Sequence, residues 1–123
     1  MGRRRRHRHH LASKNVNARL DRKLAALADP ARRRAVELLR ERPRRAGELA
    51  EALALPAPAM SRHLRALKES GLVEETHPEF DARVRVYALK DGAMRDLKKW
   101  VEDTERLWVD QLAAFRAHVE KKK

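Results

Sequence analysis

Two short helical patterns separated by a proline-bearing break occupy residues 46 to 73, and this spacing restricts the folds open to the chain. The first pattern repeats apolar residues at the three- and four-residue spacings of an amphipathic helix. Its inward positions are Leu49, Ala52 and Leu53. In the break, Pro56 disfavours helix for the residue before it, and Pro58 is tolerated in a first helical turn. The stretch therefore predicts a helix, a tight connection and a second helix.

The second pattern is apolar on one side and basic on the other. Its inward positions are Met60, Leu64 and Leu67, and Gly71 follows as a C-terminal cap. Its outward positions are Ser61, Arg62, Arg65 and Lys68, with His63 at the flank. Arginine can bind guanine bidentately or hold phosphate, so this face suits the major groove of DNA. An ordinary amphipathic surface helix is the alternative interpretation.

The overall charge also indicates an anionic partner. The chain has 123 residues, a formal net charge of +12 and a sequence pI of about 11.0. A single domain of this size with such a basic excess favours a polyanion, nucleic acid first and an acidic membrane surface second. The absence of cysteine excludes disulfides, thiolate zinc sites and cysteine nucleophiles.

No apolar run approaches membrane-spanning length, and no apolar segment follows the N-terminal charges as a secretory signal requires. We therefore expect a cytoplasmic protein without a membrane partner. Enzymatic functions are also unsupported, because the chain has no Gly-rich phosphate loop, no nucleophile elbow and no plausible pair of catalytic carboxylates. No catalytic residue is predicted.

The chain is expected to comprise a disordered basic tail over residues 1–16 and one folded domain over residues 17–120. Five arginines and three histidines fall within the first ten residues. Such a tail could neutralise phosphate or enter a minor groove, or it could bind nickel or zinc loosely through its histidines. An adventitious or non-specific role is favoured over a dedicated one.

Two further helices are predicted before residue 46. The first covers residues 17–28, with Leu20, Leu24 and Leu27 in line. Asp29 and Pro30 form a strong start signal for the second, as N-cap and first helical residue. That helix is expected to run to about Glu41, before Pro43 ends it. Its predicted buried residues are Ala35, Val36, Leu38 and Leu39.

A β-hairpin and a long helix are predicted after Gly71. The strands are expected near residues 72–77 and 83–89, because the latter alternates with a period of two. Arg83 and Arg85 would project near the tip, where basic residues can reach phosphate or the minor groove. A solvated edge strand protected by charge is the alternative.

The last helix is predicted from about Asp91 towards Glu120, with a long apolar stripe. The stripe comprises Leu97, Val101, Thr104, Trp108, Gln111, Phe115 and Val119, widened by Trp100, Leu107 and Leu112. So small a domain does not need this stripe for its own core, which implies a partner helix. A terminal helix folded back onto its own chain is the alternative.

The order of these elements resembles the ArsR-type winged helix-turn-helix repressors over roughly residues 18–119. The residues that carry the resemblance before the two-helix motif are Leu27-Ala28-Asp29-Pro30-Ala31-Arg32 and Val36-Glu37-Leu38-Leu39. Within and after the motif they are Glu48-Leu49-Ala50, Met60-Ser61-Arg62-His63-Leu64, Leu67-Lys68-Glu69-Ser70-Gly71-Leu72-Val73, Arg83 and Tyr87-Ala88-Leu89.

The resemblance implies a mostly α fold with a small β-hairpin, in the order helix, helix, helix-turn-helix, wing, helix. It also implies a homodimer that represses transcription from an inverted-repeat operator in double-stranded DNA. The resemblance implies base-reading positions at Ala57, Pro58, Ser61 and Arg62, with supporting contacts from Arg65, Arg83 and Arg85. His63 and Lys68, on the basic side of the same helix, complete the predicted DNA-binding residues. The implied dimerisation residues are Leu20, Leu24, Leu97, Trp100, Val101, Thr104, Leu107, Trp108 and Phe115.

The sequence departs from this family's pattern in three ways. Ala57, Pro58 and Ala59 lack polar side chains, which assigns base recognition chiefly to Ser61 and Arg62. Ala82 also stands at the wing tip, where glycine is usual.

Metal-sensing members carry Cys-x-Cys ligands in the first motif helix or Asp/His clusters on the last helix. The segment 48–52 has no such ligands, and His118, Glu120 and Asp110 do not form a convincing paired site.

We therefore expect a member of the metal-independent branch, with no cofactor, and the sequence identifies no effector. Three functions remain open on the sequence alone. The first is a sequence-specific dimeric repressor, the second is an architectural or non-specific nucleic-acid binder, and the third is a metal or small-molecule sensor whose site forms across the dimer.

Overall fold

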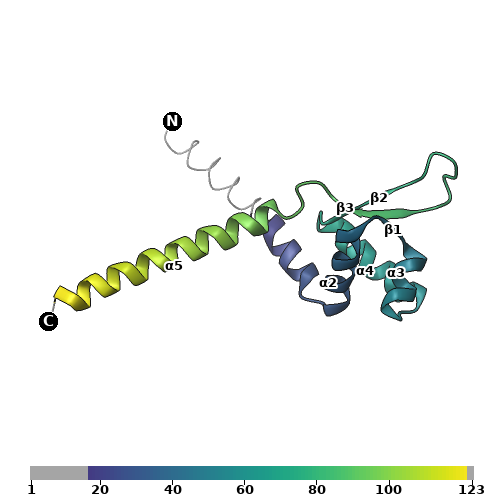
Figure 1. Cartoon of the computed structure of the whole chain (residues 1–123). Coiled ribbons are helices and arrows are strands. Elements are labelled where there is room, and N and C mark those ends of the chain that lie inside the picture. The colour runs from purple at the N-terminus through teal and green to yellow at the C-terminus, as the bar shows by residue number, and fades with distance from the viewer. Residues whose placement is uncertain (1–16, 122–123) are drawn as a thin grey trace, which may run out of the picture. The chain divides into compact units, whose positions relative to one another are not determined.

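The computed structural model describes residues 17–121 (Figure 1). The predicted basic tail, residues 1–16, lies outside them. The chain divides into two compact units, Met1–Ala93 and Met94–Lys123. The first unit contains helices and a small sheet, and the second consists of one long helix. Mostly helical architecture with a small antiparallel sheet confirms the predicted winged helix-turn-helix fold class.

A helix over residues 17–27 is followed by α2, Pro30–Glu41. The predicted start signal of α2 is confirmed, because Oδ1 of Asp29 accepts hydrogen bonds from the backbone N–H groups of Ala31 (2.8 Å) and Arg32 (3.2 Å). These bonds satisfy two of the N–H groups that a helix start leaves unpaired. The prediction that Leu38 is buried is wrong. It is half-buried, at the rim of an open depression beside α3.

The two motif helices are α3, Ala46–Leu53, and α4, Ala57–Glu69. The chain leaves α3 through Ala54, which adopts a left-handed conformation with φ 54° and ψ 45°. Its backbone N–H reaches the carbonyl oxygens of Ala50 and Glu51. This closure of the last turn redirects the chain into α4 within three residues, at the break that the prolines predicted.

The core of the first unit lies between α2, α3, α4 and the sheet. Its fully buried large side chains are Leu49, Met60, Leu64, Leu67, Leu72 and Val73. The predicted inward face of α4 is therefore confirmed, and burying each such side chain contributes about 1.5–3 kcal/mol. On α3 the prediction was partly wrong, because Ala52 is exposed and Leu53 is half-buried. Gly71 follows α4 with φ 83°, as its predicted capping role requires.

The sheet has three antiparallel strands in the order β1-β3-β2, one more than predicted. They are β1 (Arg44–Arg45), β2 (Val73–Thr76) and β3 (Val86–Leu89). The prediction of strand structure from residue 83 is wrong. Oδ1 of Asp81 accepts a hydrogen bond from the backbone N–H of Arg83 at 3.0 Å, and this local turn replaces the ladder there. The hairpin of β2 and β3 extends from the helices as a long wing (Figure 1).

A buried lysine joins the two ends of the first unit. Nζ of Lys23 donates a hydrogen bond to the backbone oxygen of Ala93 at 2.8 Å.

After a turn over residues 91–94, α5 covers Arg95–Lys121 and so begins four residues later than predicted. No helix in the described part of the chain is long and apolar enough to span a membrane.

Candidate nucleic-acid interface

The α4 helix presents two chemically opposite faces. One carries the buried residues Met60, Leu64 and Leu67. The other presents six of the predicted DNA-binding residues to solvent: Ala57, Pro58, Ser61, Arg62, Arg65 and Lys68. Core packing thus sets the rotation of the helix about its axis. It leaves small side chains at the N-terminal end and cations along the exposed face.

Arg62 and Arg65 carry charges that the protein does not neutralise. Within residues 17–121, neither side chain takes part in a hydrogen bond or an ion pair. Both are exposed, so each guanidinium can donate its hydrogen bonds to an external acceptor. Base edges and phosphate oxygens are such acceptors.

His63 differs from its neighbours because it is half-buried and already bonded. Nε of Arg32 donates a hydrogen bond to Nδ1 of His63 at 3.2 Å, which connects α2 to α4. The predicted role of His63 at the flank of the DNA-binding face stays a prediction. Its observed contact is with the protein itself.

A single carboxylate connects α4 to the wing. Oε2 of Glu75 lies 3.0 Å from Nζ of Lys68, and its Oε1 lies 3.3 Å from Nε of Arg85. The hydrogen bond from Lys68, aided by the charge of Arg85, holds the pKa of Glu75 below its ordinary value. Two of the predicted DNA-binding cations therefore share one anion, unlike Arg62 and Arg65.

The wing tip is a structured turn that exposes an aromatic ring. Nδ1 of His77 donates to the carbonyl oxygen of Val84 at 3.1 Å, and the backbone N–H of Asp81 donates to Pro78 at 3.2 Å. Phe80, between them, is 81% exposed. Arg83 is also exposed, and its Nε lies 3.6 Å from the carboxylate of Asp81. The sequence placed Phe80 in the loop but contained no signal of its exposure.

The predicted dimerisation residues lie mainly on α5, which has no buried residue. Trp108 is 61% exposed and Phe115 is 66% exposed. The other predicted residues exposed to solvent are Leu24, Trp100, Val101, Thr104 and Leu107. Leu97 is half-buried, whereas Leu20 is buried within the single chain. An apolar helix surface of this kind is typical of a protein–protein contact.

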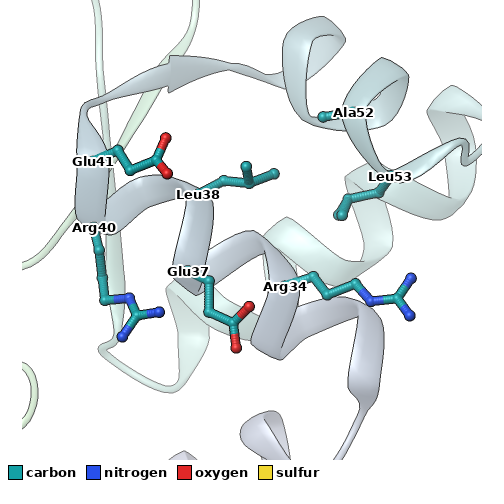
Figure 2. A pocket seen from close by; sticks show the side chains of 7 residues that line it. All are labelled: Arg34, Glu37, Leu38, Arg40, Glu41, Ala52 and Leu53. Atoms are coloured by element: carbon teal, nitrogen blue, oxygen red, sulfur yellow. The ribbon is translucent and has the colours of Figure 1, made fainter.

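An open depression of about 420 Å³ lies between α2 and α3 (Figure 2). Leu38 and Leu53 point towards the same space from the two helices, and Glu37 and Arg40 project at its edge (Figure 2). Among residues 17–121, no group of three or more His, Cys, Asp or Glu side chains is placed to hold a metal ion. The basic face of α4 and the wing remain the strongest candidate site.

Comparison with known sequences shows which family the chain resembles. Residues 29–75, which run from the N-cap of α2 to Glu75, match the family model described as "Bacterial regulatory protein, arsR family". The chain is 37% identical over 95 residues to the HTH-type transcriptional regulator Rv2034 of Mycobacterium tuberculosis. That alignment covers 77% of this chain and 83% of the relative.

Solved structures show the same fold. An ArsR-like transcriptional regulator from Rhodococcus sp. RHA1 superposes with a TM-score of 0.71 and 28% identity, covering 82% of this chain and 92% of that one. The homodimeric winged helix-turn-helix DNA-binding domain of Mb0332 from Mycobacterium bovis gives a TM-score of 0.61 and 26% identity. It covers 77% of this chain and 87% of its own.

Proposed function

The chain belongs to the arsR family of bacterial regulatory proteins, and from this premise we propose that it is a homodimeric repressor that binds an inverted-repeat operator. Members of this family are DNA-binding transcriptional regulators and not enzymes. In the proposed complex, α4 lies in the major groove and the wing contacts the adjacent backbone or minor groove. Such a regulator acts in the cytoplasm, on the nucleoid.

The two-faced α4 helix is the observation that carries this proposal. Its apolar face is buried in the core, so its polar face cannot turn inward, and Arg62 and Arg65 on that face lack a partner within residues 17–121. A guanidinium can donate two parallel hydrogen bonds to O6 and N7 of guanine, which distinguishes this base from the others. We assign base recognition to Arg62, with Ser61 beside it, and phosphate contacts to Arg65.

Dimerisation is proposed to occur through α5. Its exposed apolar surface includes both tryptophans of the chain, which an isolated monomer would leave in water. The M. bovis domain of similar fold is homodimeric. A two-fold dimer would place its two α4 helices about 34 Å apart, one turn of DNA, so that each reads one half-site.

Footprinting and fluorescence anisotropy on the DNA upstream of the protein's own gene test the proposal. We expect protection with dyad symmetry, and binding to that site at least about 10³-fold tighter than to a scrambled duplex at the same salt concentration. A non-specific binder is the alternative, favoured by the net charge of +12. Equal affinity for the two duplexes, with the same salt dependence, would establish that alternative.

A further inference from the structure

The contact between Glu75, Lys68 and Arg85 has a consequence for DNA binding, provided that the proposed function holds. We propose that Glu75 is a positioning residue that restrains these two cations and thereby suppresses binding to non-operator DNA. Glu75 would not touch DNA itself. It would act through the charges on either side of it, one on α4 and one at the base of the wing.

The pleat of β2 turns Glu75 towards α4. Side chains alternate along β2, and Val73 and Glu75 share the face that turns towards α4. Val73 is buried, and the Glu75 side chain is only 13% exposed. Its neighbour Glu74 lies on the opposite, exposed face and takes part in no ion pair within residues 17–121. The strand register therefore decides which of two adjacent glutamates meets the cations.

Each oxygen of the Glu75 carboxylate serves a different cation. Oε2 is 3.0 Å from Nζ of Lys68, and Oε1 is 3.3 Å from Nε of Arg85. Two positive charges and one negative charge leave the group with a net charge of +1. A phosphate must therefore compete with an anion that is already in place. Arg62 and Arg65 impose no such competition, because they carry no partner within the described residues.

This arrangement discriminates between operator and random DNA for an electrostatic reason. Binding to random DNA depends almost entirely on the number of phosphates that basic side chains neutralise. Partial neutralisation of Lys68 and Arg85 reduces that contribution. Lysine has three donors and arginine has five, so both side chains can retain Glu75 and still donate to a phosphate that lies in the right place. Base contacts from Arg62 would fix the operator in that register, whereas random DNA lacks this alignment.

Two simpler roles for Glu75 would give different results. Glu75 could merely lower the net charge of the protein, or it could merely stabilise the hairpin. Glu74→Gln is the matched control for charge, because it changes the net charge equally from the neighbouring position. Thermal melting of each variant reports on the hairpin, independently of DNA.

The test measures binding to a random-sequence duplex by anisotropy between about 50 and 200 mM salt. We expect Glu75→Gln to bind random DNA more tightly than wild type and to steepen the logarithmic salt dependence by about 0.9–1.8, for one or two added phosphate contacts. Glu74→Gln should leave the slope unchanged. On the operator, the gain for Glu75→Gln should be smaller, so that the ratio of operator to random affinity falls.

Equal effects of the two glutamine variants, or weaker binding of random DNA by Glu75→Gln, would overturn the proposal. If Glu75→Gln does not fold, two cation variants decide the question. Arg65→Gln should lower the salt slope by about 0.9, whereas Lys68→Gln should lower it by clearly less, because the charge of Lys68 is shared. Equal losses would refute the restraint. The random-DNA measurements need no operator, so failure of the proposed repressor function remains distinguishable from failure of this inference.

Discussion

Arg32 donates a hydrogen bond from its Nε to Nδ1 of His63 over 3.2 Å, across 31 positions of sequence. Because arginine has no acceptor, Nδ1 must be the unprotonated nitrogen, and a neutral His63 carries its proton on Nε2. Arg32 also lies in the first turn of α2, where its backbone N–H donates to the side chain of the N-cap residue Asp29. The start of α2 is thereby connected to the flank of the proposed DNA-reading helix.

Removal of the Arg32–His63 hydrogen bond should chiefly lower the free energy of unfolding, with less effect on DNA recognition. Arg32→Ala removes the donor to Nδ1 of the half-buried His63, and we expect a loss of about 0.5–1.5 kcal/mol in the free energy of unfolding, because water can partly replace that donor. Urea unfolding followed by circular dichroism measures this loss. Arg34→Ala, an exposed change on the same helix, is the control and should stay within about 0.5 kcal/mol of wild type. Equal losses in the two variants would contradict a specific role for the Arg32–His63 bond.

Arg62→Ala should relax sequence discrimination. If Arg62 pairs with guanine, the substitution costs about 1–3 kcal/mol, concentrated at one base pair in each half-site. Binding-site selection with the variant protein measures the preferred motif. Arg65→Ala serves as the comparison and should weaken all sequences alike. An unchanged motif with uniformly weaker binding by the Arg62 variant would instead assign Arg62 to phosphate.

Replacing Leu107 and Trp108 by glutamate should yield monomers. Both side chains are exposed on α5, and charge on an apolar contact surface must be desolvated for the dimer to form. Light scattering measures the mass, and operator binding should weaken because one half-site is lost. Arg106→Glu on the same helix removes no apolar surface and should leave the dimer intact. A double variant that still forms dimers would exclude this part of α5 from the contact.

Ala54→Gly should stabilise the protein. Ala54 is the one non-glycine residue with positive φ within residues 17–121, at φ 54°. A left-handed conformation costs an alanine about 1–2 kcal/mol, and glycine avoids this cost. Part of the gain is offset, because glycine gives the unfolded chain greater conformational freedom. We expect a net gain of about 0.5–1 kcal/mol in urea unfolding, with unchanged DNA affinity. A variant less stable than wild type would indicate that the alanine methyl group makes a compensating contact.

The free energy of unfolding should fall as the pH drops below about 4, the ordinary pKa of a carboxyl side chain. The hydrogen bond from Arg42 lowers the pKa of Glu48, and that from Lys68 lowers the pKa of Glu75. Burial raises the pKa of Asp29, but two backbone N–H donors bring it below its ordinary value.

A carboxyl with a lowered folded pKa binds fewer protons when folded than when unfolded in this range. The stability that it contributes is therefore present above its unfolded pKa and is lost as the pH falls through its folded pKa. Melting temperatures from pH 7 to pH 3 should decline, and Glu48→Gln should flatten the decline. A melting temperature that stays constant between about pH 5 and pH 3 would rule out the shifts.

Local signals in the sequence determined the helices and the inward face of α4. Asp29 and Pro30 begin α2, Gly71 follows the end of α4, and Met60 and Leu64 are buried as their spacing predicted. These features need only neighbours a few residues away, because caps act within one turn and apolar periodicity reflects the helix repeat itself. The basic outer face of α4 followed from the same periodicity, and the function of its residues remains a prediction.

Only the tertiary structure decided which residues pair in the sheet and which charges meet. Arg44 and Arg45 form a strand solely because β3 lies beside them, and two residues carry no periodicity to read. Glu75 contacts Lys68 and Arg85, while the adjacent Glu74 faces solvent, and this choice depends on the strand register and on how β2 packs against α4. Composition assigns the same charge to both glutamates. Distance in space separates them, because an ion pair requires contact within a few ångströms and sequence order does not provide it.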